Sequence, residues 1–293
     1  MTTERETRLA EEFDAARPRL VRVAYSILGS RAEAEDAVAD CWLRLVTADR
    51  KEPIDDVAAW STVAVARLAL DVLKSARVRR EAYVGPWLPE PELGAAPDPA
   101  DRVSLDESVR YALLVALEQL SPAERTAWVL HDLFEVPFDE IATTVGRTPA
   151  AVRQLASRAR RHVAAGTPRI DVDRAEHDEV VAAFVAAAAG GDLSALVRTL
   201  DPDVVLTSDG GGVVSAARRP VVGDDRVARF VLGVAPKMAG EISTVDVNGR
   251  TGLAFRVGDR LTAVMALTVA DHLVRRVDIV LAPDKLRSWP SPE

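Results

Sequence analysis

Two short helical segments joined by a glycine turn constrain the fold of this chain more than any other feature. Residues 138–145 follow a helical pattern, and Gly146 with Arg147 is expected to form the turn. Thr148 is placed to cap the next helix, and Pro149 suits its first position, where the missing N–H costs no hydrogen bond. This succession predicts a helix-turn-helix.

The second helix of this motif is predicted to have an apolar stripe and a basic face. The stripe consists of Val152, Leu155, Ala159 and Val163. Arginine and glutamine on the opposite face are the side chains that read guanine and adenine edges in the major groove. The alternative is a helical hairpin with a solvated basic face, which the turn, the cap and the acid-free face disfavour. The predicted DNA contacts here are Arg147, Thr148, Arg153, Gln154, Ser157, Arg158 and Arg161.

The first part of the chain, residues 5–81, is predicted to contain three helices, at about 13–27, 32–47 and 55–80. The second helix carries acidic and apolar side chains on a face that suits a basic protein partner. These predicted partner contacts are Asp36, Asp40, Trp42 and Leu45. The third helix is apolar at first and basic at its end, which suits DNA phosphates. Its predicted DNA contacts are Trp60, Arg67, Lys74, Arg77, Arg79 and Arg80.

The net charge and Trp60 each have a simpler interpretation than a role in DNA binding. The formal net charge is −8, but phosphate is bound by a local basic patch rather than by the whole-chain average. Trp60 suits stacking on an unpaired base, although packing in the core is the favoured interpretation for this side chain.

A proline-rich stretch, residues 82–104, is predicted to be an extended linker, because five prolines exclude a helix or a central strand. Trp87 within it either packs on the nearest domain or makes a dedicated contact. Helical pattern resumes at 105–120, and Ser121, Pro122 and Glu124 form a capping-box signature for the helix that follows, to about residue 132.

The last part of the chain changes from helices to strands. Helices are predicted at 173–189, 193–200 and 224–232. Strands are predicted at 204–207, 213–217, 241–247, 251–257, 261–269 and 272–281, with hairpin breaks at 248–249, 258–259 and 270–271. This order predicts a compact α+β domain with a curved antiparallel sheet.

Three stretches resemble RNA polymerase sigma factors of the sigma-70 family. RAEAEDAVADCWLRLV (31–46) resembles the helix that grips the polymerase clamp helices. AAWSTVAVARLALDVLKSARVRR (58–80) resembles the segment that melts and reads the promoter element nearest the start site. LEQLSPAERTAWVLHDLFEVPFDEIATTVGRTPAAVRQLASRARRHV (117–163) resembles the domain that reads the upstream element. Factors with only these two domains belong to the extracytoplasmic-function group; Leu68 stands where many of them have asparagine.

The third part resembles a SnoaL-like domain, and a subgroup of these sigma factors carries that fusion with three short motifs. WLPEP occurs in the linker and DGGG in the extra domain, while the expected NPDKL is APDKL, with Ala282 in place of asparagine. The resemblance implies regulation in cis through contacts among the motifs, with DGGG as a loop of free amides. The implied regulatory residues are Trp87, Leu88, Pro89, Glu90, Pro91, Asp209, Gly210, Gly211, Gly212, Pro283, Asp284, Lys285 and Leu286.

The predicted architecture is therefore multi-domain. Two all-α sigma domains (5–81 and 105–165, the second with the helix-turn-helix) flank the linker 82–104, and a cone-shaped α+β SnoaL-like domain covers 172–288. The resemblance implies core RNA polymerase and promoter DNA as partners, and it leaves open a small-molecule ligand in the C-terminal domain. No cofactor or metal is expected, since Cys41 is the single cysteine. With no signal peptide or long apolar run, we expect a cytoplasmic protein.

Two other classes of function compete with a sigma factor. SnoaL-like folds include enzymes, but acid–base chemistry needs an Asp–His or Tyr–Asp pair, and the extra domain has only His177 and His272 and no tyrosine. Asp209 is its one acid in a distinctive setting, so regulation is favoured over catalysis. A helix-turn-helix repressor with a sensor domain would leave residues 5–81 unexplained.

Overall fold

The computed structural model describes residues 2–81, 83–94, 110–166, 172–234 and 240–287, with the side chains of 2, 3, 77–81 and 166 left out. Contacts divide the chain into two compact units. Unit 1 combines Met1–Glu81 with Ala116–Val163, and unit 2 combines Ala82–Val115 with Ala164–Glu293. The described part of the proline-rich stretch therefore belongs with the C-terminal residues.

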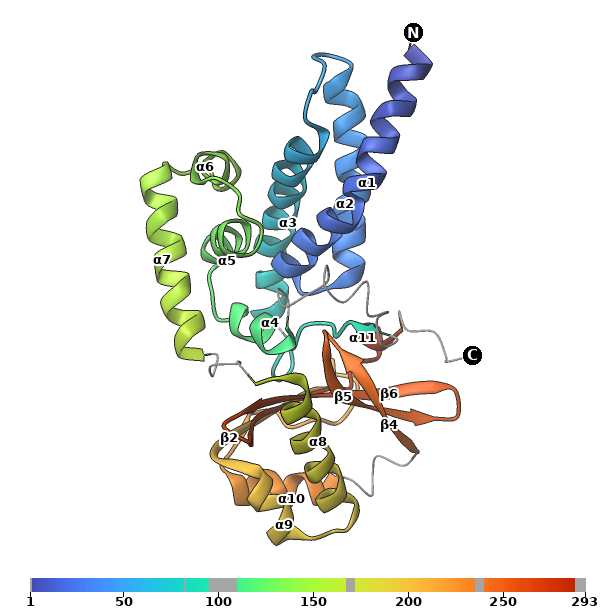
Figure 1. The fold of residues 1–293 in the computed structure, drawn as a ribbon, viewed down its shortest axis with the longest axis vertical. Coiled ribbons are helices and arrows are strands. Elements are labelled where there is room, and N and C mark those ends of the chain that lie inside the picture. The colour runs from blue at the N-terminus through green and yellow to red at the C-terminus, as the bar shows by residue number, and fades with distance from the viewer. Residues whose placement is uncertain (1, 82, 95–109, 167–171, 235–239, 288–293) are drawn as a thin grey trace. The chain divides into compact units, whose positions relative to one another are not determined.

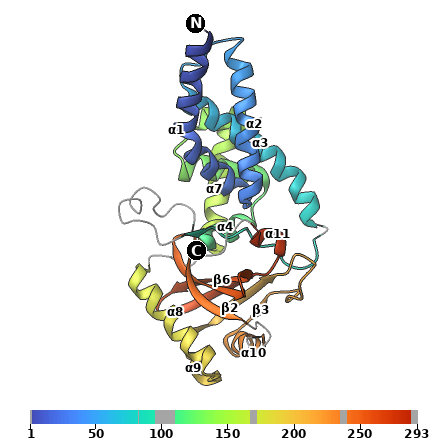
Figure 2. The ribbon, with the colours of Figure 1, turned by 90° about the vertical axis from the view of Figure 1, so that its right-hand side faces the viewer.

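Unit 1 begins with three long helices that pack side by side: α1 (Thr2–Leu28), α2 (Arg31–Asp49) and α3 (Val57–Glu81) (Figures 1 and 2). Gly29 has a φ of 69°, a left-handed conformation that ends α1. Ser30 then caps α2, since its hydroxyl accepts a hydrogen bond from the Glu33 N–H. These ends confirm the predicted helix breaks.

The rest of unit 1 is built from short helices. They are α4 (Tyr111–Leu117), which runs across the boundary of the two units, α5 (Pro122–Trp128), the π-helix η1 (Val129–Leu133), α6 (Phe138–Val145) and α7 (Pro149–Gly166). Ser121 and Glu124 form the predicted capping box. The helix predicted to continue to about residue 132 changes to a π-helix at Val129. Of the helix predicted at 105–120, residues 105–109 lie outside the described residues.

Unit 2 contains a seven-stranded mixed sheet in the order β1-β4-β5-β6-β7-β2-β3. Its strands are β1 (Leu93–Gly94), β2 (Leu200–Asp209), β3 (Val221–Val222), β4 (Glu241–Val247), β5 (Arg250–Val257), β6 (Arg260–Ala270) and β7 (Leu273–Val280). The expectation of a wholly antiparallel sheet is wrong, because β2 pairs with β7 in parallel. This pairing needs a long crossover, and α10 with β4 to β6 provides it.

The hairpins follow the predicted turn chemistry with two corrections. Asn248 and Gly249 have φ values of 49° and 81°, as a type I′ turn requires. The last hairpin turns at Asp271 and His272, with φ of 51° and 59°, one residue later than predicted. The strand predicted at 213–217 is wrong, because those residues are irregular and pair with no strand.

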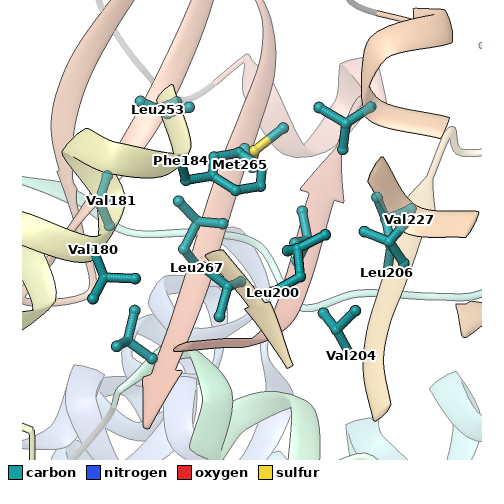
Figure 3. Packing of buried hydrophobic residues seen from close by; sticks show 14 of the residues in the cluster. Val180, Val181, Phe184, Leu200, Val204, Leu206, Val227, Leu253, Met265 and Leu267 are labelled. Carbon is teal, nitrogen blue, oxygen red and sulfur yellow. The ribbon is translucent and has the colours of Figure 1, made fainter. Parts of the chain in front are cut away.

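Three helices cover one face of the sheet: α8 (Arg174–Ala189), α9 (Leu193–Thr199) and α10 (Asp224–Val234) (Figure 1). Figure 3 shows apolar side chains of α8, such as Phe184, meeting Met265 and Leu267 of β6. Leu206 of β2 and Val227 of α10 continue the same core, and all five side chains are buried. The α+β class predicted for this part is therefore confirmed.

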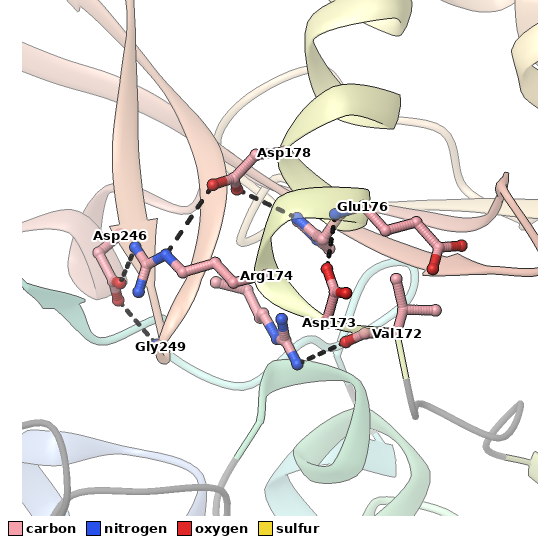
Figure 4. Close-up of polar contacts among 9 residues, drawn as sticks. Val172, Asp173, Arg174, Glu176, Asp178, Asp246 and Gly249 are labelled. Atoms are coloured by element: carbon pink, nitrogen blue, oxygen red, sulfur yellow. Dashed lines mark hydrogen bonds and ion pairs between the residues drawn. The ribbon is translucent and has the colours of Figure 1, made fainter.

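The start of α8 is fixed to the sheet by polar contacts (Figure 4). The Asp173 carboxylate caps the helix by accepting a hydrogen bond from the Glu176 N–H, 2.8 Å away. Arg174 donates to Asp246 of β4 across 3.3 Å, and Asp246 also accepts from the Gly249 N–H. Asp246 also lies opposite Gly94 of β1, so α8 and β1 both contact β4 at this residue.

Candidate functional site

The helix-turn-helix forms as predicted. Gly146 has a φ of 68° and ends α6 in the left-handed conformation, which glycine adopts without strain. The Thr148 hydroxyl accepts a hydrogen bond from the Ala151 N–H at 3.3 Å, and α7 begins at Pro149. Residues 138–163 thus hold a short helix, a turn and a capped helix in the expected order.

The two faces of α7 separate largely as predicted. Val152 and Ala159 are buried, together with Ala156, whereas Leu155 and Val163 are only half-buried. All seven side chains predicted to contact DNA are exposed: Arg147, Thr148, Arg153, Gln154, Ser157, Arg158 and Arg161. The basic face is therefore presented to solvent.

Some arginines of α7 already have partners in unit 1. Arg158 Nε lies 3.1 Å from Glu124 Oε1, so it pairs with the acid of the capping box. Arg160 Nε lies 2.5 Å from Asp132 Oδ1, and the Arg153 guanidinium lies 5.4 Å from the centre of the Phe138 ring. Arg161 makes no ion pair with any described residue. Arg158 would have to leave Glu124 before it could contact a base.

The predicted partner face of α2 is only partly exposed. Asp36 and Asp40 are exposed, and Trp42 is half-buried with its ring centre 5.2 Å from that of Phe13. Leu45 is fully buried, so the prediction of a partner contact there is wrong: its place in the apolar period directs it into the helical core. The exposed apolar side chain is Leu43, with 63% of its surface accessible, which the sequence did not single out.

The basic side of α3 is described in part. Arg67 and Lys74 are exposed, and Lys74 lies 3.0 Å from Asp71. Trp60 is half-buried, an exposure compatible with both roles considered for it. The side chains of Arg77, Arg79 and Arg80 lie outside the described residues.

A buried arginine joins the two helical segments of unit 1. Arg125 is the bulkiest fully buried side chain among the described residues, with 1% of its surface exposed. Its Nε donates to the backbone carbonyl of Ser26 in α1 at 3.1 Å, and its Nη1 pairs with Glu118. From α1, Arg19 donates to the carbonyl of Phe134 at 2.9 Å. This interface could not be predicted from local pattern, because an arginine after a capping box is expected on a helix surface.

The WLPEP, DGGG and PDKL segments meet at one carboxylate in unit 2. Asp209, at the end of β2, is completely buried. Its Oδ2 accepts from the Leu88 N–H at 2.8 Å and lies 2.6 Å from Lys285 Nζ, and its Oδ1 accepts from the Tyr83 hydroxyl at 2.6 Å. Burying a charge is costly unless it is paired and hydrogen-bonded, and here four donors (counting the Gly211 N–H) satisfy it.

Lys285 closes the cluster from the opposite side. It belongs to the short helix α11 (Pro283–Leu286), and its ammonium group also donates to the Leu88 carbonyl. The ammonium lies 4.0 Å from the centre of the Trp87 ring and 5.4 Å from that of Tyr83, within range of cation–π attraction. Trp87 therefore packs on the domain through a dedicated contact. Tyr83 was missed, since it lies just outside the WLPEP motif.

The DGGG loop differs from the expectation of free amides. The Gly211 N–H donates to Asp209, and the Val213 and Val214 N–H groups donate to the Gly210 carbonyl. A side chain at Gly210 would meet the Val214 carbonyl oxygen at 2.1 Å, so only glycine fits. A β-carbon on Gly211 would lie 3.1 Å from that of Ala282, which leaves little room at this position.

The linker is held at its other end by the sheet edge. Leu93 pairs with Val247 in β1 and β4. The Asn248 side-chain oxygen accepts from the Glu92 N–H at 3.0 Å, and the Asn248 N–H donates to the Glu92 carbonyl at 2.8 Å. Between the two ends Leu88, Pro89, Glu90 and Pro91 are all buried. The described linker is thus part of unit 2, and its prolines lie before β1, where no ladder hydrogen bond needs their missing N–H.

Comparison with known proteins identifies the helical part. Residues 13–79 match the family model for Sigma-70 region 2, and residues 110–163 match that for Sigma-70, region 4. The chain is 44% identical over 297 residues to the ECF RNA polymerase sigma factor SigJ of Mycobacterium tuberculosis, covering 96% of this chain and 94% of that protein. The chain belongs to the extracytoplasmic-function sigma factors.

One further relative and one solved structure also cover nearly all of this sigma factor. The probable ECF RNA polymerase sigma factor SigI of M. tuberculosis is 38% identical over 275 residues, covering 93% of this chain and 92% of that protein. The crystal structure of M. tuberculosis SigJ superposes with a TM-score of 0.78 at 39% identity, covering 97% of this chain and all of that one. Both matches include the C-terminal α+β domain.

The family decides between the competing functions. Sigma factors direct RNA polymerase to promoters, so this sigma factor acts in promoter-specific transcription initiation and is not itself an enzyme. The match to region 2 also accounts for the helices that a helix-turn-helix repressor would leave unexplained.

Two buried titratable groups of the C-terminal domain have polar partners inside it. His177 is buried with Nε2 3.1 Å from the Leu267 carbonyl oxygen, and burial lowers its pKa. Its Nδ1 lies 3.8 Å from Asp178 Oδ1. Asp278 is buried beside Arg276 at 2.7 Å, and burial raises its pKa. A cavity of about 30 Å³ beside His177 has room for about two water molecules.

Among the described residues, no three or more His, Cys, Asp or Glu side chains are grouped so that they could hold a metal ion. None of the helices in the described ranges is long and apolar enough to cross a membrane.

Proposed function

We propose that the C-terminal domain regulates this sigma factor in cis by holding the linker that joins its two DNA-reading segments. The observation that carries the proposal is the buried Asp209, which binds both the Leu88 backbone and Lys285. Each of the three motifs contributes to this contact, with Trp87 and Leu88 from WLPEP, Asp209 from DGGG and Lys285 from PDKL. Through this contact, the position of the linker depends on whether the C-terminal domain keeps Asp209 and Lys285 in place.

We also propose which segments contact the transcription machinery. Residues 5–81 would bind core polymerase and melt the promoter, 105–165 would read the upstream element, 82–104 would connect them, and 172–288 would regulate. On α2 the exposed Asp36, Asp40 and Leu43 support a polymerase contact, with Trp42 at its edge. Binding to polymerase and promoter places the protein in the cytoplasm.

Reconstituted transcription tests the regulatory proposal. We expect that Trp87→Ala and a truncation before Pro283 raise transcription from a cognate promoter severalfold. The physical reason is that α3 packs against α5 and α6 in unit 1, so region 2 and region 4 must separate before both can lie on DNA. A linker released from Asp209 and Lys285 permits that separation more easily.

The controls distinguish release of the linker from loss of folding. Circular dichroism should be unchanged, and Val222→Ala, an exposed side chain of β3, should transcribe like the wild type. Wild-type activity in both linker variants would contradict regulation through this contact.

DNA binding by α7 gives a second test. Arg153→Ala should weaken binding to the cognate upstream element by about 1–3 kcal/mol and relax base preference at one position. Arg161→Ala should weaken binding evenly across sequences, as expected for a lost phosphate contact, and reduce the salt dependence. Binding curves at two salt concentrations on cognate and scrambled DNA measure both effects. Equal, sequence-independent losses in the two variants would leave a basic face without base readout.

A further inference from the structure

A cavity of about 360 Å³ lies between the start of the linker and the loop that follows β2. Val84 and Pro86 line it from the linker, and Val213, Val214, Ser215 and Arg218 line it from the loop. Its volume is within the range of small-molecule sites. It is separate from the helix-covered core, where apolar side chains pack together.

One side of the cavity is formed by exposed valines. Val84, Val213 and Val214 have 61%, 79% and 37% of their surface accessible. They are close in space, because a β-carbon on Gly212 would lie 3.5 Å from that of Val84. Apolar side chains gathered at a cavity mark a place where an apolar group is covered on binding.

The other side offers hydrogen-bond donors and a positive charge. Arg218 forms no ion pair with a described residue, as is also true of Arg198, Arg219 and Arg226 of the same domain, but of these four arginines Arg218 is the one that lines the cavity. In the described part of the chain the Ser215 hydroxyl also has no hydrogen-bond partner. No aspartate or glutamate lines the cavity. This electrostatic environment favours an anion.

We propose that this cavity binds a small carboxylate with a short apolar chain. The carboxylate would accept hydrogen bonds from Arg218 and Ser215, and the chain would cover Val84, Val213 and Val214. Arginine suits this role because its planar guanidinium binds a carboxylate through two parallel hydrogen bonds.

Binding of a ligand in this cavity would also affect docking of the linker. Val84 and Pro86 directly precede Trp87 and Leu88, which the Asp209–Lys285 pair holds. A ligand that contacts both the linker and the loop binds more tightly when the linker is docked, so by linkage it favours docking. This consequence rests on the proposed regulation in cis, whereas binding itself does not.

Titration calorimetry on the full chain without polymerase tests the site, with hexanoate as the probe. We expect saturable binding at millimolar concentration, with both 1-hexanol and acetate binding at least about tenfold more weakly. Arg218→Gln should weaken hexanoate binding about tenfold. Arg219→Gln is the matched control, because it removes the same charge from the next residue, which does not line the cavity.

A second variant tests the apolar side independently. Val213→Ser should weaken hexanoate but leave acetate binding unchanged, and the exposure of Val213 means that folding is not at risk. Absence of saturable hexanoate binding, or equal losses in Arg218→Gln and Arg219→Gln, would overturn the site. If hexanoate binds as expected but has no effect on reconstituted transcription, the site stands and its coupling to the linker fails, whereas the proposed regulation fails only if Trp87→Ala and the truncation before Pro283 keep wild-type activity.

Discussion

Asp209→Asn should release the linker from the C-terminal domain. The substitution keeps the shape of the side chain but leaves Lys285, whose side chain is 9% exposed, without its counter-charge. Breaking a buried ion pair by removing one partner costs roughly 3–5 kcal/mol. The linker can avoid this cost by detaching, because water then reaches the ammonium group.

Hydrogen exchange at the Leu88 amide reports this release directly, because that N–H donates to Asp209 in the folded protein. Its exchange should become more than about a hundredfold faster. Asp203→Asn is the matched control, an exposed aspartate on the same strand, and it should leave exchange at Leu88 unchanged. Adding Lys285→Met to Asp209→Asn should recover part of the lost stability in urea unfolding. Full protection of Leu88 in Asp209→Asn would show that the carboxylate does not hold the linker.

Arg125→Ala should destabilise unit 1 by about 3–5 kcal/mol. The substitution removes the donor to the Ser26 carbonyl, leaves Glu118 without its partner at only 15% exposure, and opens a cavity where the largest buried side chain had been. Since Arg125 and Ser26 belong to different helical segments, we expect the contact between regions 2 and 4 to loosen first.

Urea unfolding followed by circular dichroism measures the loss, and exchange at amides of α1 and α5 locates it. Arg158→Ala is the comparison, because the Arg158 side chain is 50% exposed and Glu124 keeps its hydrogen bonds with Ser121, so this pair should contribute only about 0–1 kcal/mol. A similar loss of unfolding free energy in Arg125→Ala and Arg158→Ala would show that the burial of Arg125 adds nothing to stability. Arg125→Lys should recover little of the lost stability, since lysine lacks the planar guanidinium group that donates to the Ser26 carbonyl and to Glu118 at the same time.

The helices of this sigma factor could be predicted closely from local chemistry. Gly29 with Ser30, the Ser121 capping box and Thr148 with Pro149 lie at helix ends in the structure. These signals act within a few residues, so they need no knowledge of the rest of the fold. The hairpin turns, such as Asn248-Gly249, were predictable for the same reason.

The features that could not be predicted depend on contacts between distant residues. Nothing local in β2 specifies β7 as its parallel neighbour. The β-branched Val213 and Val214 favour a strand, although no described residue pairs with them in a ladder. Asp209 was singled out from the sequence, but its buried contacts involve Lys285 and Tyr83, which lie 76 and 126 residues away in sequence. Leu45 was misplaced because an apolar residue on a helix suits a core as well as a partner.

The docked linker has a consequence for the reach of the polypeptide. Roughly 30 residues lie between the end of α3 and the start of α4. A fully extended tether of that length would span at most about 100 Å. With residues 83–94 laid along the sheet, the remaining stretch of roughly 15 residues can span at most about 50 Å. Docking therefore changes the effective concentration of one DNA-reading segment near the other's binding site. Under the proposed regulation in cis, the C-terminal domain would tune promoter selection through tether length.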